Sequence, residues 1–282
     1  MRILLTGGSG QLGTALRRAL SDAGELRAPS RAKLDVTDAA RVRDAVLSFS
    51  PDAVVNATGF NDVDGAEDRP FEALALNALA VRALARAADE SAAVLVHYGT
   101  DFVFDGEASR PYVETDEPRP RSVYGISKLA GEDYALGARR AYVLRVESLF
   151  GGPRAKSTVD RIAAALSRGE PVRAFSDRVV TPSHVDDVAA ATAALLASRP
   201  AHGLYHCVAS GETTWLSLAR ELERLLGRSS LVTPVTTREV PLRAARPRYC
   251  ALSNAKLRSA GFGMPSWQNA LERYIGTTRA AR

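Results

Sequence analysis

A tyrosine and a lysine stand four residues apart in the segment Tyr124-Gly125-Ile126-Ser127-Lys128. On a helix this spacing places both side chains on one face, so the phenol and the ammonium group can point into one cleft. A nearby cation stabilises a phenolate, and we therefore expect Lys128 to lower the pKa of Tyr124 from its ordinary value of about 10. Such a pair predicts a proton donor for a carbonyl oxygen. The alternative is an exposed helical pair without chemistry.

A threonine, Thr100, lies in the segment from His97 to Phe104, which follows the apolar run Val94-Leu95-Val96. We expect Thr100 just beyond the carboxyl end of a strand, the place where open α/β sheets bind their ligands. Its hydroxyl group can donate a hydrogen bond to a substrate carbonyl. The other interpretation is a threonine that only caps a turn.

Three glycines, Gly7, Gly10 and Gly13, follow the apolar run Ile3-Leu4-Leu5 and precede an apparent helix. A strand, a glycine turn and a helix start form the arrangement that binds a dinucleotide pyrophosphate. The first glycine permits a tight turn, the second lets the backbone approach phosphate, and the third lets the helix pack on the strand. Unpaired N–H groups at the helix start favour the anion. The cofactor contacts predicted here are Gly7, Gly10, Gln11, Leu12 and Gly13.

The end of the second predicted strand bears on the choice of cofactor. An acidic residue there holds the ribose of NAD, whereas an arginine accommodates the 2′-phosphate of NADP. The chain reads Ala28-Pro29-Ser30-Arg31 at this point, with no acid. Ser30 and Arg31 therefore favour NADPH, with NADH as the second choice. The alternative for Arg31 is a solvated loop cation.

The first 150 residues alternate short apolar segments with segments of helical character. This alternation predicts an α/β fold, a Rossmann-type doubly wound parallel sheet with helices on both faces. The predicted strands are Arg2–Leu5, Leu26–Ala28, Ala53–Asn56, Val94–Tyr98 and Ala141–Arg145. The predicted helices are Gln11–Ala23, one that opens at Thr37 with Asp38 in its first turn, Pro70–Ser91 and Ser122–Leu136.

The pattern changes after residue 150. We expect a dinucleotide-binding domain over residues 1–150 and a smaller C-terminal α/β substrate domain over residues 151–282, some of whose elements return to pack on the first sheet. The second half is predicted to hold helices at Ser157–Ser167, Asp186–Ala197 and Trp215–Leu226, strands at Val172–Ala174, near Val179-Val180 and at Gly203–Val208, and a loop over Pro241–Arg248.

The composition indicates a protein with a sizeable core, because 46% of its 282 residues are hydrophobic. The sequence contains neither an apolar run near ~18 residues nor a signal peptide, so we expect no membrane partner. Cys207 and Cys250 lack metal-ligand spacing, which predicts free thiols in a reducing cytoplasm and no metal site. The net charge of +5 is scattered and comes with no nucleic-acid motif, which favours an anionic small molecule over nucleic acid.

Longer motifs extend over most of the chain: Val55-Asn56-Ala57, Val63-Asp64-Gly65-Ala66-Glu67, the segments from His97 to Phe104 and from Tyr124 to Glu132, Gly203-Leu204-Tyr205-His206, Ser210-Gly211 with Thr213-Thr214-Trp215, and Arg246-Pro247. They resemble those of the dTDP-4-dehydrorhamnose reductase family, within the extended short-chain dehydrogenase/reductase superfamily. The resemblance spans nearly the whole chain. It implies NADPH-dependent reduction of the C4 keto group of a 6-deoxy sugar carried on a nucleotide diphosphate, and it suggests a homodimer.

The resemblance also implies roles for individual residues. Tyr124 would give a proton to the C4 oxygen, and Thr100 would hydrogen-bond the same oxygen. Lys128 would lower the pKa of the tyrosine and hold the nicotinamide ribose. Tyr124 and Lys128 would thus also contact the cofactor, which Asp35, Val36 and Ala57 would border. The substrate-binding residues expected are Asp64, Thr100, Asp101, Glu147, Ser148 and Arg246.

Two of these assignments have open alternatives. Asp64, together with Glu67, either touches sugar hydroxyls or forms a carboxylate pair at a helix start, favoured by the helix dipole. The basic group Arg238–Arg248, with Arg243 and Arg246 as the best candidates, either binds the diphosphate bidentately or forms a solvated loop.

One segment departs from the family pattern. Rhamnose-forming members typically read Arg-Thr-Ser-Trp after the last strand of the first half, whereas this chain reads Arg145-Val146-Glu147-Ser148. A small polar residue in place of an indole reshapes a sugar pocket, so another deoxysugar is an open alternative. Glu147 either binds a sugar hydroxyl or amine, or pairs with an arginine.

Two other functions use parts of the same pattern. A nucleotide-sugar 4-epimerase uses the Tyr-x-x-x-Lys pair but retains its cofactor through the cycle. A regulatory subunit that only binds a dinucleotide does not need an acid. The intact set of Thr100, Tyr124 and Lys128 favours an enzyme over the second of these.

Overall fold

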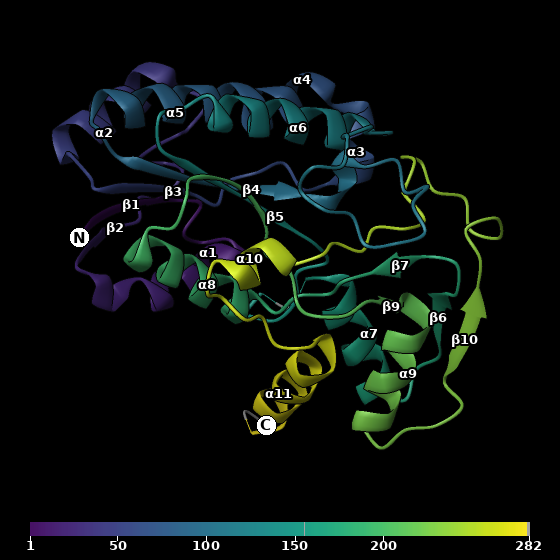
Figure 1. Ribbon diagram of the computed structural model, residues 1–282. Coiled ribbons are helices and arrows are strands. Elements are labelled where there is room, and N and C mark those ends of the chain that lie inside the picture. Colours follow the sequence, from purple (N-terminus) through teal and green to yellow (C-terminus); the bar gives the residue numbers. More distant parts are fainter. Residues whose placement is uncertain (155, 281–282) are drawn as a thin grey trace.

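Six parallel strands form one twisted sheet in the computed structural model, which describes residues 1–154 and 156–280 (Figure 1). The strand order is β2-β1-β3-β4-β5-β8. From β1 the chain first forms β2 on one side and then crosses over to form β3, β4 and β5 on the other side. The direction of strand order therefore reverses beside β1, and α/β sheets bind ligands at such a point. The strands are β1 (Arg2–Thr6), β2 (Glu25–Arg27), β3 (Ala53–Asn56), β4 (Val94–Thr100), β5 (Ala141–Val146) and β8 (Gly203–His206).

Helices cover both faces of this sheet (Figure 1). On one face lie α2 (Ala39–Phe49), α5 (Ala80–Glu90) and α6 (Val123–Leu136), with the short α3 (Val63–Asp68) and α4 (Pro70–Leu74) at the end of that layer. On the other face lie α1 (Gln11–Ala19), α8 (Val185–Ser198) and α10 (Ala255–Ser259). Successive strand residues point to opposite faces, so Leu4 joins the α2/α5 core while Ile3 and Leu5 join the α1/α8 core.

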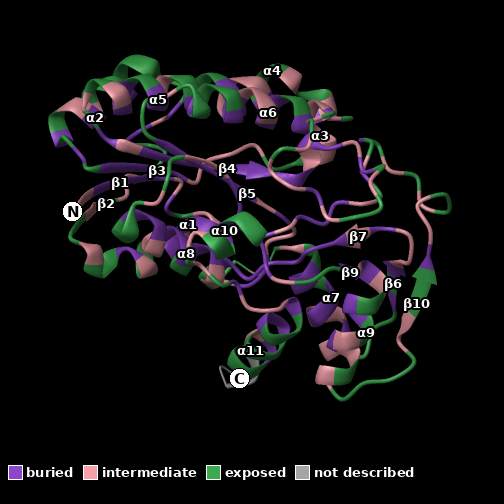
Figure 2. Ribbon diagram, in the orientation of Figure 1, coloured by how far each residue is buried: buried purple, intermediate pink, exposed green. Residues whose placement is uncertain are grey.

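A smaller lobe packs beside the carboxyl ends of the strands (Figure 1). It has its own buried apolar core, to which Phe150, Leu166, Leu218 and Leu271 contribute, and Figure 2 shows this second buried interior. The lobe consists of α7 (Thr158–Ser167), α9 (Trp215–Leu225), α11 (Trp267–Ala280), the parallel pair β6 (Val172–Phe175) and β10 (Val232–Val235), and the antiparallel pair β7 (Val179–Val180) and β9 (Thr213–Thr214).

The predicted helix Pro70–Ser91 is the largest departure from expectation. It is interrupted by a π-helical turn at Ala75–Leu79 between α4 and α5. The turn carries the buried side chain of Asn77, which bonds both the N–H and the C=O of Phe60 and the hydroxyl of Ser127. The extra residue in the π-helical turn places this amide where it can hydrogen-bond the backbone of the loop at Phe60. No local pattern in the helix could indicate this contact.

Smaller differences concern the ends of elements. The predicted helix Gln11–Ala23 ends at Ala19 and continues as a 3₁₀ turn over Ser21–Ala23, and the predicted strand Gly203–Val208 ends at His206. Within the residues that the structure describes, no helix combines the length and the hydrophobicity needed to cross a bilayer.

Candidate active site

A cavity of about 1000 Å³ lies at the carboxyl ends of β1, β3 and β4, where the smaller lobe meets the sheet. The predicted residues that line it are Gly7, Gly10, Gln11, Leu12, Arg31, Asp35, Val36, Ala57, Asp64, Thr100, Asp101, Tyr124, Lys128, Ser148 and Arg246. Three others, Gly13, Ser30 and Glu147, are not part of its lining.

The glycine turn between β1 and α1 packs too tightly for side chains. Gly7 has a φ of +74°, and a Cβ there would lie 2.5 Å from the carbonyl oxygen of Ala57. A Cβ at Gly13 would lie 2.0 Å from the carbonyl oxygen of Gly7, so this glycine lets α1 approach the turn. No side chain of the described residues caps α1, so its first N–H groups are available to an anion. The turn fits a dinucleotide pyrophosphate.

The loop after β2 places Arg31 at the rim of the same cavity. Its guanidinium group is largely exposed and lies 3.4 Å from the carboxylate of Asp35. Ser30 lies beside it, and its carbonyl oxygen accepts hydrogen bonds from the N–H groups of Lys33 and Leu34. An exposed arginine fits a ribose phosphate better than a ribose hydroxyl.

Tyr124 and Lys128 lie one turn apart on α6, and Thr100 is the last residue of β4 rather than the first beyond it. The Lys128 ammonium group is buried and donates a hydrogen bond of 2.5 Å to the carbonyl oxygen of Tyr98. Ser122 caps the start of α6 by accepting from the N–H of Gly125 at 3.1 Å. The strand end and the capped helix thus bring the three predicted catalytic side chains to one wall of the cavity.

Burial raises the pKa of Tyr124, and a hydrogen bond with Thr100 only partly offsets this, while the charge of Asp101 adds to it. The lowering predicted from the sequence is therefore wrong for this environment, because desolvation penalises the phenolate. Burial also lowers the pKa of Lys128 to about 8, against the charge of Glu132. The phenol is thus fully protonated at neutral pH.

A buried ion pair supports this wall from behind. Glu132 on α6 accepts hydrogen bonds from Arg145 on β5 at 2.8 and 2.9 Å, and both side chains are at most 3% exposed. The second oxygen of Glu132 accepts from the N–H of Thr100 at 3.2 Å. Helix α6 and the ends of two strands are thereby held together at the point where Thr100 enters the cavity.

Asp64 and Arg246, both predicted to bind substrate, bind each other across the cavity rim. Arg246 donates from Nη2 to Oδ2 of Asp64 at 2.8 Å and from Nη1 to Oδ1 at 2.9 Å. The N–H of Ala244 also donates to Asp64. Asp64 lies in the first turn of α3, as the helix-start interpretation requires. Arg243 pairs with Asp68 and is not part of the cavity lining.

Glu147 and Ser148 point in different directions. Ser148 has a φ of +45° and lines the cavity. Glu147 is buried in the protein, and one of its oxygens accepts from the N–H of Thr181 at 2.8 Å. Direct contact between Glu147 and a sugar in the cavity, one of its two predicted roles, does not match this orientation.

The lining residues that were not predicted as contacts include four basic side chains and a tryptophan. The basic residues Arg154, Lys156 and Arg161 surround the start of α7, and Arg178 comes from the segment before β7. Trp215, expected only to pack, is buried in the lobe core and also lines the cavity. Its buried indole N–H has no hydrogen-bond partner among the described residues. The three basic residues near Ser157 are close together in the sequence, and this grouping could have indicated contacts with an anionic ligand.

The doubly wound sheet, the glycine turn after its first strand and the Tyr-x-x-x-Lys helix beside one cavity define a Rossmann-type protein of the extended short-chain dehydrogenase/reductase class. The family model described as the RmlD substrate binding domain matches residues 1–280, and the chain belongs to this family. Its relatives are named as reductases, and it is an oxidoreductase.

Three relatives illustrate the match. A dTDP-4-dehydrorhamnose reductase of Streptomyces griseus is 38% identical over 96% of this chain and 91% of its own length. A probable dTDP-4,6-dihydroxy-2-methyloxan-3-one 4-ketoreductase of Streptomyces antibioticus is 36% identical over 96% and 93%. The crystal structure of dTDP-4-dehydrorhamnose reductase from Bacillus anthracis in complex with NADP is 29% identical, with a TM-score of 0.93 over 98% and 99% of the two chains.

Proposed function

We propose that the protein reduces the C4 keto group of a nucleotide-activated 6-deoxy sugar with NADPH. The observation that carries this proposal is that Thr100, Tyr124 and Lys128 share a cavity with the glycine turn. A bound nicotinamide supplies the hydride. The names of the Streptomyces relatives support a C4 reduction, and the NADP in the Bacillus anthracis structure supports the cofactor.

The chain's own residues supply the proton and the orientation. Tyr124, kept protonated by its raised pKa, donates its proton to the C4 oxygen, and Thr100 hydrogen-bonds that oxygen. Lys128 holds the nicotinamide ribose, and its positive charge stabilises the phenolate that the transfer leaves behind. Holding the carbonyl between these groups also contributes orientation.

The other predicted site residues divide between cofactor and substrate. The turn residues bind the pyrophosphate, Ser30 and Arg31 the 2′-phosphate, and Asp35, Val36 and Ala57 the adenosine side. Asp64, Asp101, Ser148 and Arg246 face the substrate. The basic residues Arg154, Lys156 and Arg161 add positive charge beside it, which favours a diphosphate.

We further propose that residues 1–150 form the cofactor-binding part and residues 151–282 the substrate-binding part. The protein would act as a homodimer in the cytoplasm, where its buried thiols Cys207 and Cys250 stay reduced.

The test is NADPH oxidation, followed by nicotinamide absorbance, with dTDP-4-keto-6-deoxyglucose in the presence and absence of a 3,5-epimerase. Tyr124→Phe is expected to lower kcat by about 100-fold or more, the range of a positioned acid. The matched control is Tyr134→Phe, a partly exposed tyrosine on the same helix. NADH is run in parallel.

The outcomes separate the candidate substrates. Turnover that requires the epimerase indicates a rhamnose-type reductase, and turnover without it indicates another C4 reduction. No oxidation of NADPH under either condition, with NADPH still bound, would contradict the dTDP-sugar assignment.

A further inference from the structure

Two carboxyl groups and a thiol meet in the protein interior directly behind Thr100. Asp101 follows β4, Glu147 follows β5, and Cys250 belongs to the strand-like segment that pairs with β7. One side-chain atom from each lies within 4.8 Å of the other two. All three side chains are buried. We call this group the carboxyl cluster.

One oxygen of Glu147 has no hydrogen-bond partner among the residues that the structure describes, although it is fully buried. Its other oxygen is satisfied by the N–H of Thr181. A buried carboxylate oxygen without a partner is costly, whereas a protonated carboxyl group can donate to a nearby acceptor. Two carboxylates so close together in the interior cannot both ionise readily. The geometry therefore indicates that the pair holds one proton.

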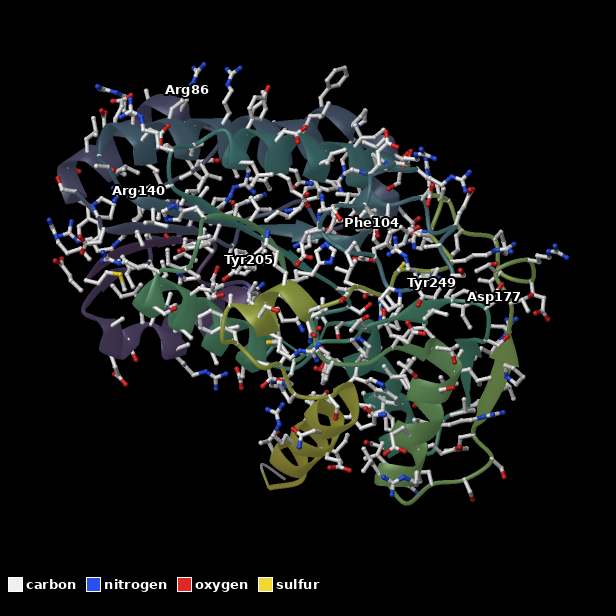
Figure 3. All side chains as sticks on the ribbon, in the orientation of Figure 1. Arg86, Phe104, Arg140, Asp177, Tyr205 and Tyr249 are labelled. Atoms are coloured by element: carbon white, nitrogen blue, oxygen red, sulfur yellow. The ribbon has the colours of Figure 1, made fainter. Side chains whose placement is uncertain are left out.

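The charges around the cluster agree with a shared proton. Burial and the charge of Asp101 raise the pKa of Glu147 well above its usual value, and Arg178 opposes this only in part. Burial raises the pKa of Asp101 to about 6, against hydrogen bonds from Cys250 and Thr100. The other titratable neighbours are Tyr124 on α6 and Tyr249 beside β7, which is labelled in Figure 3.

A cation is the other ligand that this cluster could attract, but its surroundings favour a proton. The guanidinium group of Arg178 already supplies positive charge to both carboxyl groups. Burial raises the pKa of Cys250 well above its usual value, and a thiol must lose its proton to bind a metal.

The cluster is connected to the proposed acid. The Thr100 hydroxyl lies 3.1 Å from a carboxylate oxygen of Asp101. The same hydroxyl shares a hydrogen bond with Tyr124. Hydrogen bonds thus lead from Asp101 through Thr100 to the phenol, and a carboxyl oxygen of Glu147 lies within 4.8 Å of one of Asp101.

We infer that Asp101 and Glu147 share one proton and that this proton returns to Tyr124 through Thr100 after each reduction. The inference rests on the proposed function. Once the Tyr124 O–H bond has broken in favour of the C4 oxygen, Thr100 gives its hydroxyl proton to the phenolate and takes one from Asp101. Asp101 is replenished from Glu147. The pair is left with two negative charges and regains its proton from solvent.

The first turnover needs only the proton already on Tyr124, whereas later turnovers need the pair. Glu147→Gln keeps the size of the side chain but cannot hold the shared proton. In stopped-flow measurements of NADPH oxidation we expect a burst of one equivalent per active site at the wild-type rate. The steady-state rate that follows should be about 100-fold slower, comparable to the loss of a positioned acid. Glu170→Gln, an exposed carboxylate paired with Arg168, is the matched control.

A merely structural role for Glu147 would slow the burst and the steady state equally, and that result would overturn the inference. Unchanged steady-state turnover in Glu147→Gln would also overturn it. If the wild-type protein shows neither a burst nor any turnover, that result would instead count against the proposed function.

Two measurements do not depend on kinetics of the variant. The infrared spectrum of the wild type at pH 7 should contain the carbonyl band of a protonated buried carboxyl group, which disappears when the pH is raised. In wild-type protein the steady-state rate should fall with rising pH before the burst rate does, because the pair loses its proton first. A missing band, or a bound transition metal in the purified protein, would refute the shared proton.

Discussion

At the scale of single residues, the chemistry depends on what surrounds each side chain. Burial raises the pKa of Tyr124 and keeps its phenol protonated, which suits the proton-donor role that we propose for it. Lys128, buried and bonded to the carbonyl oxygen of Tyr98, is placed to stabilise the phenolate once it forms.

Arg31 provides the residue-scale prediction. Its exposed guanidinium group at the cavity rim is the side chain we assign to the 2′-phosphate. Arg31→Ala is expected to weaken NADPH binding about 10-fold, the equivalent of one charge-assisted hydrogen bond, and to leave NADH binding unchanged. Quenching of intrinsic fluorescence by each cofactor measures both affinities.

The control is Arg27→Ala on β2, an exposed arginine that pairs with Glu25 and is not part of this cavity lining. Equal loss of NADPH and NADH affinity in Arg31→Ala would show that the arginine does not distinguish the cofactors.

At the scale of elements, the active-site wall depends on α6, β4 and β5 being held in register. The buried pair of Glu132 and Arg145 makes this connection, and Gly99 allows it, since a Cβ there would lie 2.1 Å from an oxygen of Glu132. Burial nevertheless raises the pKa of Glu132 in spite of the nearby Arg145 charge. The pair thus positions the elements without adding much net stability.

Removal of Glu132 and removal of Arg145 should lower the free energy of unfolding by different amounts. Glu132→Gln leaves a buried arginine that cannot lose its charge, and we expect the free energy of unfolding to fall by about 3–5 kcal/mol. Arg145→Met should cost less, because Glu132 can take up a proton. Urea unfolding at pH 7 measures both losses.

The pH dependence gives a second readout of the same pair. In Arg145→Met the pKa of Glu132 in the folded state is raised further above its unfolded value. The native state then binds more protons than the unfolded state, so stability falls as the pH rises through this interval and recovers on acidification. Glu132→Gln should show no such recovery. A larger loss in Arg145→Met than in Glu132→Gln at pH 7 would contradict this account.

At the scale of the whole molecule, the first 150 residues do not complete their own core. Strand β8 covers the edge of β5, and α8 packs with α1 against the sheet. The later residues that join this core are Val185, Val188, Ala189, Ala191, Leu195, Leu196, Tyr205, Cys207, Leu257 and Met264. The division that we propose at residue 150 therefore separates proposed functions, and the two parts share one core.

A fragment of residues 1–150 tests this point. Without β8 and α8 it exposes one face of the sheet core and an unpaired strand edge, so we expect an aggregation-prone chain without cooperative urea unfolding. The full chain is the control, monitored by circular dichroism. A fragment that unfolds cooperatively and binds NADPH would show that the first part folds on its own.

Much of the fold was predictable because its signals are local. The buried strand Ala53–Asn56 was predicted with its observed ends, since a short apolar run between turn residues has few other interpretations. Strand β10 was missed because Pro234 interrupts a short run, and only pairing with β6 makes it a strand. The turn at Asn77 was missed because its partners lie in other elements.

The sequence by itself determined the glycine turn, the parallel sheet and the shared face of Tyr124 and Lys128, because backbone geometry relates each of these to spacing along the chain. Only the tertiary structure decided the direction of the Tyr124 pKa, the pairing of Asp64 with Arg246, and the meeting of Asp101 and Glu147. These depend on desolvation and on charges from segments far apart in sequence, which come together only when the sheet and the smaller lobe pack.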